Sequence, residues 1–482
     1  MDVSLLQVQA ASRPGRLLDL QPARTLARVA TVALLLVAFL FPAILNGFPV
    51  VFPDTGGYLS AAVEGKLNNG RAAIYGALLA LGIPSQFWLV IVAQAAVTVW
   101  LLALGLRVHG LGGRPLRLLL VGGGLAALTG LPWFAAQLMP DIWAPAAVMS
   151  LYLLACRAGW LRRWEKVLLA VVVAFAMASH MATIALVLGL GAAIALMRLV
   201  APRLSLPRPR LAGPVVAASL GILTALGSNL ALAGKFAFTP GGFNFLFARL
   251  IDTGLVARYL DDNCPDPAIR LCPYRHRLLP EVGDVWLTRG DAWLWYEHSP
   301  LYDLGGWDAF EEEARRFVFG TLAAYPLAHL RGAMDGTLVQ LTMVETGDWL
   351  TAPTGDTRRV IEAVAPGSAM AYRTARQQQG DYDFSMDNLV HVPVALAATL
   401  LLPLVIWLAR RRMVRPPVGL FAGVILVSLV GNAVICGALA SAHHRYQSRL
   451  VPLASLVAVV AALTLRWRAG QWKVVTRGHE AR

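Results

Sequence analysis

The chain has 482 residues, of which 57% are hydrophobic and only 15% are charged. Because about a quarter of the residues in a soluble domain are charged, this composition excludes an ordinary soluble protein. The net charge of +14 would suit a nucleic-acid-binding protein. However, the arginines fall in short loops between apolar runs, where they mark the cytoplasmic side of a membrane protein. We therefore predict no nucleic-acid partner.

Apolar runs of about 20 residues recur along the chain, which is the length needed to cross ~30 Å of hydrocarbon. The runs are continuous rather than alternating, and this pattern indicates helices rather than the strands of a barrel. The sequence therefore predicts an all-α polytopic membrane protein that is embedded among membrane lipids.

The first apolar run covers residues 25–48. Arginines precede and open this run, so we expect a cytoplasmic N-terminus and a retained helix rather than a cleaved signal peptide. The loop that follows is then extracytoplasmic. It contains the turn FPDTGGY, residues 52–58, in which Asp54 lies at the membrane edge four positions before Tyr58.

The second apolar run, residues 87–106, returns the chain to a basic cytoplasmic loop, and residues 118–155 are long enough for two crossings. Pro132 and Pro140 bracket a break in the middle of that stretch, and basic loops flank it on both sides. The turn between the two crossings is therefore expected on the outer side, at Asp141.

Residues 167–197 also lie between two basic loops, so two short crossings with an outer turn at His180 are expected. Each crossing would be at or below the lower limit of about 17 residues. A single tilted helix is the alternative, and it would reverse the sides of everything that follows.

The seventh span, residues 212–233, precedes a long polar region that holds nearly all the acidic residues. Counting spans places this region outside as a mixed or helical insertion. The expected parts are an N-terminal transmembrane module (1–234), an extracytoplasmic cap (235–388) and a C-terminal transmembrane part (389–482). Cys264 and Cys272 are close in sequence within the exported cap, so a disulfide between them is predicted.

Three more apolar runs, at residues 389–409, 418–439 and 450–465, bring the expected number of spans to about ten. An arginine block at residues 410–412 and a basic tail place the C-terminus in the cytoplasm. The outer turn SAHHRYQSR, residues 441–449, breaks this pattern because Arg445 and Arg449 lie on the outer side. Charges that violate the rule usually have a ligand or an acidic partner.

One face of the membrane therefore collects polar side chains from separate loops. Carboxylates there can take a proton from a hydroxyl group, and guanidinium groups present planar forks to phosphate oxygens. Two carboxylates can also hold a divalent ion, Mg²⁺ or Mn²⁺, that bridges a phosphate. This set suits the transfer of a group from a phosphate-linked donor. Its members are Asp54, Asp141, His180, His443, Arg445, Tyr446 and Arg449.

Each of these residues also has a structural alternative. Asp54 and Asp141 could each cap a helix that begins beside them, and His180 could be a hydrogen-bonded residue of a tight turn. Arg445 and Arg449 could bind lipid headgroups or pair with the cap, and His443 could be a surface residue. The tryptophans of the cap suit anchoring at the headgroup layer more than stacking against a sugar.

The ordered set resembles the GT-C superfamily of integral-membrane glycosyltransferases, which use polyprenyl-phosphate sugars and include the protein O-mannosyltransferases and the lipid A aminoarabinose transferases. Asp54 matches an acidic residue in the first outer loop of that family, and Asp141 matches a second one between the third and fourth spans. The polar region 235–388 matches a large outer loop after the seventh span, and Arg445-Tyr446 matches an Arg-Tyr pair that opens a late helix. The lone first-loop carboxylate and the three final spans depart from the pattern of some relatives.

The resemblance implies a GT-C-like fold and an inverting sugar transfer. Asp54 would be the general base beside the acceptor, and Asp141 would support a metal ion, held by both carboxylates, or the donor phosphate. The donor would be a polyprenyl-phosphate-linked sugar with its tail in a lateral groove between helices, and the acceptor a lipid or glycan. The site would face the periplasm at a bacterial inner membrane. The residues expected at the donor phosphate are Arg445, Tyr446, Arg449 and His443, and those expected against substrate are Tyr58 and His180.

Two other functions fit parts of the pattern. A transporter or flippase for a lipid-linked sugar would use the same outer face, but transporters usually carry polar residues near mid-membrane and internal repeats. The spans of this chain are nearly free of charge. An O-antigen polymerase or ligase would depend on outer-face arginine and histidine rather than on Asp54.

Overall fold

The computed structural model describes residues 20–65, 69–204, 208–234, 236, 238, 241–278, 288–351 and 355–465. Throughout these ranges the regular structure is helical, and an isolated parallel β-bridge joins Val50 to Gln137. The basic N-terminal segment and the basic C-terminal tail considered above lie outside the described residues.

The N-terminal part, the polar region and the C-terminal part of the chain each form a series of helices. The N-terminal part forms α1 (Leu20–Asn46), α2 (Pro53–Glu64), α3 (Ala73–Gly82), α4 (Trp88–Val108), α5 (Pro115–Leu128), α6 (Leu131–Ala135), the short 3-10 helix η3 (Pro140–Ile142), α7 (Trp143–Cys156), α8 (Arg163–Ser179), α9 (Met181–Val200) and α10 (Ala212–Ala233). The polar region forms α11 (Gly242–Asp252), α12 (Leu255–Asn263), α13 (Arg289–Trp295), α14 (Pro300–Asp303), α15 (Gly306–Ala324), α16 (Pro326–Thr342), α17 (Gly355–Val364) and α18 (Ala369–Thr374). The last part forms α19 (Ser385–Arg410), α20 (Pro416–Leu439), α21 (His444–Ser448) and α22 (Val451–Thr464).

Seven helical stretches within the described ranges are long and apolar enough to cross a membrane, namely α1, α4, α9, α10, α19, α20 and the consecutive pair α21–α22. They make this chain a multi-pass membrane protein. The expected count of about ten spans is not confirmed, because α5 and α7 have 14 residues each and α8 has 17. The proline-bracketed break between α5 and α7 forms α6 and η3 and so takes residues from both flanking helices.

Residues 163–200 form two helices rather than one tilted helix. The chain becomes extended at His180, with φ −154° and ψ 123°, between the end of α8 and the start of α9. Both helices pack against α10. The turn that the sequence predicted at His180 is therefore present.

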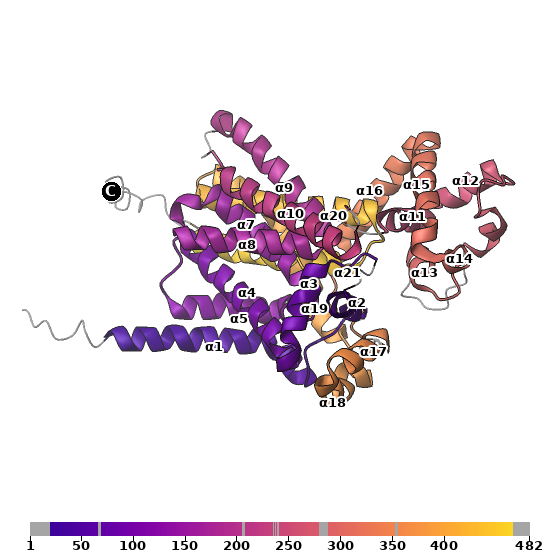
Figure 1. Cartoon of the computed structure of the whole chain (residues 1–482). Coiled ribbons are helices and arrows are strands. Elements are labelled where there is room, and N and C mark those ends of the chain that lie inside the picture. The colour runs from indigo at the N-terminus through magenta and orange to yellow at the C-terminus, as the bar shows by residue number, and fades with distance from the viewer. Residues whose placement is uncertain are drawn as a thin grey trace, which may run out of the picture.

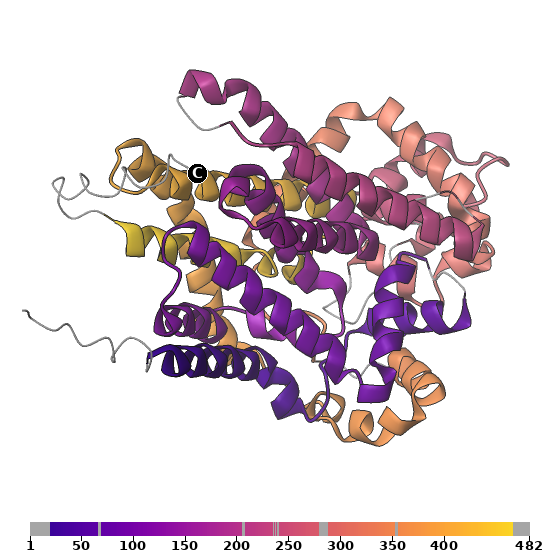
Figure 2. The same ribbon diagram turned by 60° about the vertical axis from the view of Figure 1, so that its left-hand side comes forward.

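The start of α1 and the end of α22 lie at the same end of the helical bundle, on the left in Figure 1 and again in Figure 2. Helices that begin or end there carry a series of basic residues, whereas α2 and α21 lie toward the opposite end in Figure 1. The polar region also lies at that opposite end. The basic residues are Arg107, Arg114, Arg117, Arg157, Arg162, Arg163, Lys166, Arg198, Arg410, Arg411, Arg412 and Arg415.

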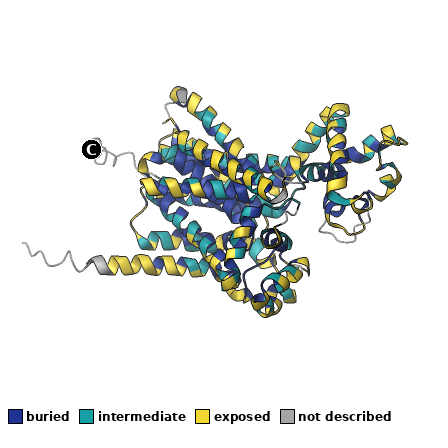
Figure 3. Cartoon of the chain, in the orientation of Figure 1, coloured by how far each residue is buried: buried dark blue, intermediate teal, exposed yellow. Residues whose placement is uncertain are grey.

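The expected cap forms two parts with different cores. Helices α11–α15 enclose a separate apolar core around Phe247, whose ring lies 5.0 Å from those of Trp293 and Phe310. Helices α17 and α18 instead join the core of the bundle, where Tyr372 contacts Phe48 at a ring distance of 5.8 Å. Buried residues are accordingly concentrated in the bundle in Figure 3, with a smaller group in the α11–α15 lobe.

Helix α16 connects the lobe to the bundle by packing along α20. The two helices meet at Gly336 and Gly437, where an added Cβ on Gly336 would lie 2.1 Å from the Gly437 carbonyl oxygen. An added Cβ on Gly437 would lie 2.3 Å from the Gly336 carbonyl oxygen. Only small residues permit so close an approach of two helix backbones.

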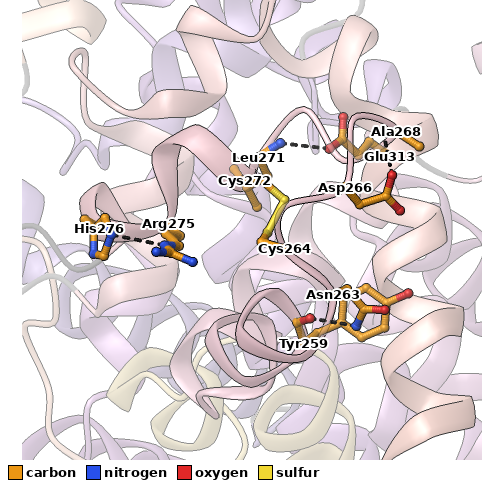
Figure 4. Close-up of a disulfide and its surroundings, with 10 residues drawn as sticks. All are labelled: Tyr259, Asn263, Cys264, Asp266, Ala268, Leu271, Cys272, Arg275, His276 and Glu313. Carbon is orange, nitrogen blue, oxygen red and sulfur yellow. Dashed lines mark hydrogen bonds between the residues drawn. A yellow bond between two sulfur atoms is a disulfide. The ribbon is translucent and has the colours of Figure 1, made fainter.

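A disulfide joins Cys264 and Cys272 in the lobe, as Figure 4 shows. The loop that it closes is held to α15 because the Leu271 N–H donates to Glu313 Oε1 at 3.2 Å. Arg270 Nε donates to the other oxygen of Glu313 at 2.8 Å. The disulfide therefore belongs to the framework of the lobe.

Candidate functional site

The loop after α1 (the first loop) and the loop before α7 (the second loop) are hydrogen-bonded to each other. The Val50 N–H donates to the carbonyl of residue 136 at 3.0 Å, and the Leu138 N–H donates back to the Val50 carbonyl at 2.8 Å. Thr55 Oγ1 also donates to the Leu138 carbonyl at 3.0 Å. The backbone segments that carry Asp54 and Asp141 are thus fixed against each other.

Helix α17 and the segment after α18 hold the first loop from its other side. Thr357 Oγ1 donates to the Pro53 carbonyl at 3.0 Å and accepts the Gly56 N–H at 3.0 Å. An added Cβ on Gly56 would lie 2.8 Å from Thr357 Cα, so this position requires glycine. Gln377 Nε2 donates to the Val51 carbonyl at 2.7 Å, and Gln377 Oε1 accepts the Val51 N–H at 3.1 Å.

Asp54 is the second residue of α2 and faces two arginines. The helix start is capped by Thr55, whose Oγ1 accepts the Phe52 N–H at 2.9 Å, so Asp54 is not the N-cap. Arg71 Nη2 donates to Asp54 Oδ1, and Arg445 Nη1 lies 3.8 Å from Asp54 Oδ2. Burial raises the pKa of Asp54, but the two guanidinium groups outweigh burial and hold the pKa below its usual value.

Gly57 provides the space through which Arg71 reaches that carboxylate. An added Cβ on Gly57 would lie 3.3 Å from Arg71 Nε. Arg71 Nη1 also donates to the Asn69 carbonyl at 2.9 Å, which orients the guanidinium plane. Gly56 therefore allows the close approach of α17, and Gly57 allows the close approach of Arg71.

Asp141 forms a buried ion pair with Arg449. Arg449 Nη1 donates to Asp141 Oδ1 at 2.8 Å, and the two side chains are 0% and 3% exposed. Arg449 Nη2 lies 3.4 Å from Asn432 Oδ1, and Asn432 Nδ2 donates to the Tyr446 carbonyl at 2.8 Å. The second loop, α20 and the α21–α22 segment thereby meet at one point.

Arg445 lies between two aromatic rings. Its guanidinium carbon is 4.3 Å from the centroid of Phe52 and 4.9 Å from that of Tyr446. Arg445 Nη2 donates to the Tyr446 hydroxyl at 3.2 Å. The Arg445 backbone N–H donates to Asp348 Oδ2 at 3.1 Å, which anchors the first turn of α21 to the polar region.

His180 lies at the α8–α9 junction, where its ring interacts electrostatically with both carboxylates and both arginines of α21–α22. The pKa of His180 is lowered to about 4, chiefly by burial and next by the charge of Arg449. Asp141 opposes this shift. The imidazole is therefore neutral near pH 7.

Tyr58 is buried beside the same carboxylates. Burial raises its pKa, and the negative charges of Asp54 and Asp141 add to the rise. Its ring packs edge-on against Tyr75 at 5.4 Å, and the Tyr75 hydroxyl donates to Gln94 Oε1 at 3.0 Å. Tyr58 thus presents a phenol that stays protonated to the interior of the site.

Several buried polar atoms around these residues have no hydrogen-bond partner among the described residues. Such atoms are rare in proteins and usually mark the place of a ligand or water. Most of the groups are hydrogen-bond donors, a pattern that suits an anion. The atoms are Arg445 Nε and Nη1, Arg449 Nε, His180 Nδ1, Ser179 Oγ, Thr183 Oγ1 and Ser448 Oγ.

His443 faces the polar region rather than the Asp141–Arg449 pair. Its Nε2 lies 3.3 Å from Asp291 Oδ2, and its Nδ1 lies 4.0 Å from Asp348 Oδ2. Gln340 of α16 holds the backbone of His443, since Gln340 Nε2 donates to the His443 carbonyl at 2.8 Å and Oε1 accepts the His443 N–H at 3.1 Å. The ring of His443 also packs edge-on against that of Tyr446 at 5.4 Å. The structure therefore brings the expected site residues together, with His443 at the edge of the group, where it contacts α13.

The donor set of the site does not fit a divalent metal ion. Asp54 Oδ1 is paired with Arg71 and Asp141 Oδ1 with Arg449, so each carboxylate is already balanced by a positive charge. In the described part of the chain, no group of three or more histidine, cysteine, aspartate or glutamate residues is arranged to hold a metal. We derive no step of the chemistry through Mg²⁺ or Mn²⁺.

Sequence reasoning did not find Arg71, Asp348, Asn432 and Thr357 as members of this site. Arg71 carried a usable signal, because it is a basic residue on an outer loop and breaks the charge rule in the same way as Arg445. The other three are held by contacts between segments distant in sequence, which no local pattern records.

No protein-family model matches the chain, and neither a curated protein nor a solved structure matches it.

Proposed function

We propose that this protein is a membrane glycosyltransferase of the GT-C type. It would move a sugar from a polyprenyl-phosphate donor to a lipid or glycan acceptor, with inversion at the anomeric carbon. One observation carries the proposal. Two carboxylates and three guanidinium groups, from the first loop, the second loop and the α21–α22 segment, converge at one end of a membrane-spanning bundle.

The donor phosphate is assigned to Arg445 and Arg449. Three of their N–H groups are buried without a hydrogen-bond partner among the described residues. Leaving a buried charged donor unpaired is costly, whereas a phosphate oxygen would satisfy it with a strong charge-assisted bond. The Tyr446 ring, which lies 4.9 Å and 5.4 Å from the two guanidinium carbons, holds both groups in place.

The isoprenoid tail is assigned to an apolar groove of about 600 Å³ between α5, α19 and α22. Leu125 lines this groove and also a smaller cavity bordered by Ile142 and Pro452. Ile142 follows Asp141 in sequence, and Pro452 lies in the first turn of α22, shortly after Arg449. The shared Leu125 and the closeness in sequence of Ile142 to Asp141 and of Pro452 to Arg449 support a tail in this groove.

The chemistry assigned to Asp54 is general base catalysis. The acceptor hydroxyl oxygen attacks the anomeric carbon from the face opposite the phosphate, and its proton passes to Asp54. The bond from the anomeric carbon to the phosphate oxygen breaks, and polyprenyl phosphate leaves with the electron pair. Arg445 and Arg449 stabilise the charge that develops on the leaving oxygen.

We place the protein in a bacterial inner membrane with this site at the periplasmic face. The concentration of basic residues at the opposite end of the bundle supports this orientation, since such residues favour the cytoplasm. Cysteine substitution tests it with a membrane-impermeant thiol reagent on intact cells. Arg316→Cys in α15 should be labelled, and Arg163→Cys in α8 should be labelled only after lysis. The opposite labelling pattern would reverse the orientation.

The function is tested with full-length protein in nanodiscs and a panel of radiolabelled undecaprenyl-phosphate sugars. Asp54→Asn should lower the transfer rate by about 10²–10⁴-fold, while binding of undecaprenyl phosphate stays within about threefold. Asp356→Asn is the matched control, because the Asp356 side chain is 84% exposed.

Arg449→Gln should instead weaken the binding of undecaprenyl phosphate, because it removes a phosphate donor. Full turnover by Asp54→Asn would exclude the base role. Movement of the intact donor across the bilayer by both the parent protein and Asp54→Asn, without release of sugar, would identify a flippase.

A further inference from the structure

Arg71 joins the proposed base to an aromatic surface of the polar region. Its guanidinium is bonded to Asp54, and the guanidinium carbon lies 4.6 Å from the ring centroid of Trp295, at the end of α13. One side chain therefore occupies the proton-accepting oxygen and covers an indole face at the same time. Neither contact depends on the donor site at Arg449.

Trp295 belongs to a cluster of three rings that rests against the first loop. Its centroid is 5.3 Å from that of Trp307 and 6.2 Å from that of Phe245. Phe245 packs so closely on Gly70 that an added Cβ there would lie 2.6 Å from the ring. Although it is packed in this way, Trp295 stays 39% exposed, so its indole is open to a molecule that approaches Asp54 from this side.

We propose that Trp295 and Trp307 form the acceptor subsite, and that a sugar ring of the acceptor replaces the Arg71 guanidinium between Trp295 and Asp54. This inference rests on the proposed function and deepens it by naming the acceptor class as a carbohydrate.

A sugar ring can make the same two contacts that the Arg71 guanidinium makes, one to Asp54 and one to Trp295. The guanidinium donates an N–H bond to Asp54 Oδ1 while its flat face lies on an aromatic ring. A pyranose does the same with other groups, because its C–H face can pack on an indole while a hydroxyl donates at the ring edge. An anionic lipid headgroup suits this exchange less well, since its phosphate would face the Asp54 carboxylate.

The exchange also couples acceptor arrival to base activation. While Arg71 is bound, it holds the pKa of Asp54 down, which makes the carboxylate a weaker base, and it occupies one of the two carboxylate oxygens. A water molecule is too small to displace the guanidinium from both Asp54 and Trp295. The donor is therefore protected from hydrolysis until an acceptor ring is in place.

The reaction balances in the same way for either nucleophile. The hydroxyl oxygen of the acceptor, or of water in the uncoupled case, forms the new bond to the anomeric carbon. The bond to the phosphate oxygen breaks, the proton goes to Asp54, and polyprenyl phosphate leaves with the electron pair. The acceptor hydroxyl and water differ only in how readily each of them reaches Asp54.

The test compares hydrolysis with transfer in full-length protein in nanodiscs, using the undecaprenyl-phosphate sugar that the parent protein turns over. Acceptor probes are dodecyl glycosides of glucose, galactose, mannose and N-acetylglucosamine. Arg71→Gln should raise donor hydrolysis without acceptor by about tenfold, because it opens Asp54 to water. Trp295→Ala should raise the KM for the dodecyl glycoside by about tenfold and leave the donor KM unchanged, and Trp295→Phe should restore part of the loss.

Trp160→Phe is the matched control, because the Trp160 ring also lies under an arginine, Arg157 at 5.1 Å, but Trp160 belongs to the basic segment between α7 and α8. Slower hydrolysis in Arg71→Gln, or an unchanged acceptor KM in Trp295→Ala, would overturn the inference. Failure of the proposed function would give a different result, since the parent protein would then neither hydrolyse nor transfer any donor of the panel.

Discussion

Arg449 donates to Asp141 at 2.8 Å although 308 positions separate the two residues in sequence, and neither side chain is exposed by more than 3%. Removing both charges from water is costly, and their mutual attraction together with the Asn432 contact offsets that cost. The pair joins the second loop to the α21–α22 segment, so the site forms only when the N-terminal and C-terminal parts of the bundle are both in place.

Breaking this pair should destabilise the protein strongly. Arg449→Gln or Asp141→Asn leaves one buried charge without its partner, and each should lower the free energy of unfolding by roughly 3–5 kcal/mol. The double variant Asp141→Asn/Arg449→Gln should lose less than the sum of the single losses. Unfolding in mixed micelles with increasing SDS measures all three variants.

The exposed pair Arg331–Asp335 on α16 is the control for this cycle. Its side chains are 86% and 67% exposed and 3.8 Å apart, so its removal should cost less than about 1 kcal/mol. Additive losses at Asp141 and Arg449 would contradict the pairing.

His180 should make stability depend on pH between about 4 and 6.5, the folded-state and ordinary pKa values of its ring. In this range the unfolded chain binds a proton that the folded chain does not, so stability rises with pH and levels off above 6.5. His180→Gln should flatten this rise, by up to about 1.4 kcal/mol per pH unit. Melting temperatures recorded at a series of pH values provide the measurement.

His444→Gln serves as the comparison for the pH series, because His444 is 28% exposed and is paired with Glu345 at 3.8 Å outside the carboxylate cluster. Its curve should keep the slope of the parent protein. An equal flattening in both variants would mean that the slope does not originate at His180.

The positions of the site residues at one end of the bundle were accessible from the sequence. Placing a loop on one side of the membrane requires only the number of crossings between it and the basic loops. Asp54, Asp141, Arg445 and Arg449 could therefore be assigned to the same side without knowledge of any tertiary contact. The turn at His180 followed from the same argument. The helical nature of the spans followed from their continuous apolar runs.

The partners of these residues were not accessible in the same way. Nothing local in the sequence indicates that Arg71 reaches Asp54 or that His443 turns toward Asp291, because both are side-chain contacts between distant segments. The expected number of about ten spans was also not confirmed. The proline break before Asp141 was visible, but its length, which shortens both α5 and α7 to 14 residues, depends on how α6 and η3 pack.

Removal of the disulfide should weaken the α11–α15 lobe without dissolving the bundle. Cys264→Ser/Cys272→Ser releases a short loop, with a sequence separation of 8, and this should cost the lobe roughly 2–3 kcal/mol. Hydrogen exchange should accelerate in α12 and stay unchanged in α4. Cys156→Ser, which removes a free thiol at the end of α7, is the control; faster exchange throughout the double variant would show that lobe and bundle unfold together.

Gly437→Ala should separate α16 from α20 and thereby disturb the donor site. The new methyl group would lie 2.3 Å from the Gly336 carbonyl oxygen, a backbone atom that cannot move away alone. Overpacking of this kind costs about 1–3 kcal/mol. Because Gln340 of α16 holds the backbone of His443 immediately before α21, we also expect weaker binding of undecaprenyl phosphate at Arg445.

Gly431→Ala is the matched variant in the same helix, since an added Cβ at Gly431 has no atom within 4 Å. It should leave lipid binding unchanged and alter stability by no more than about 1 kcal/mol. Both variants are measured by SDS unfolding and by undecaprenyl-phosphate binding in nanodiscs. Normal lipid binding in a destabilised Gly437→Ala protein would show that α16 supports the fold but does not position the arginines of α21.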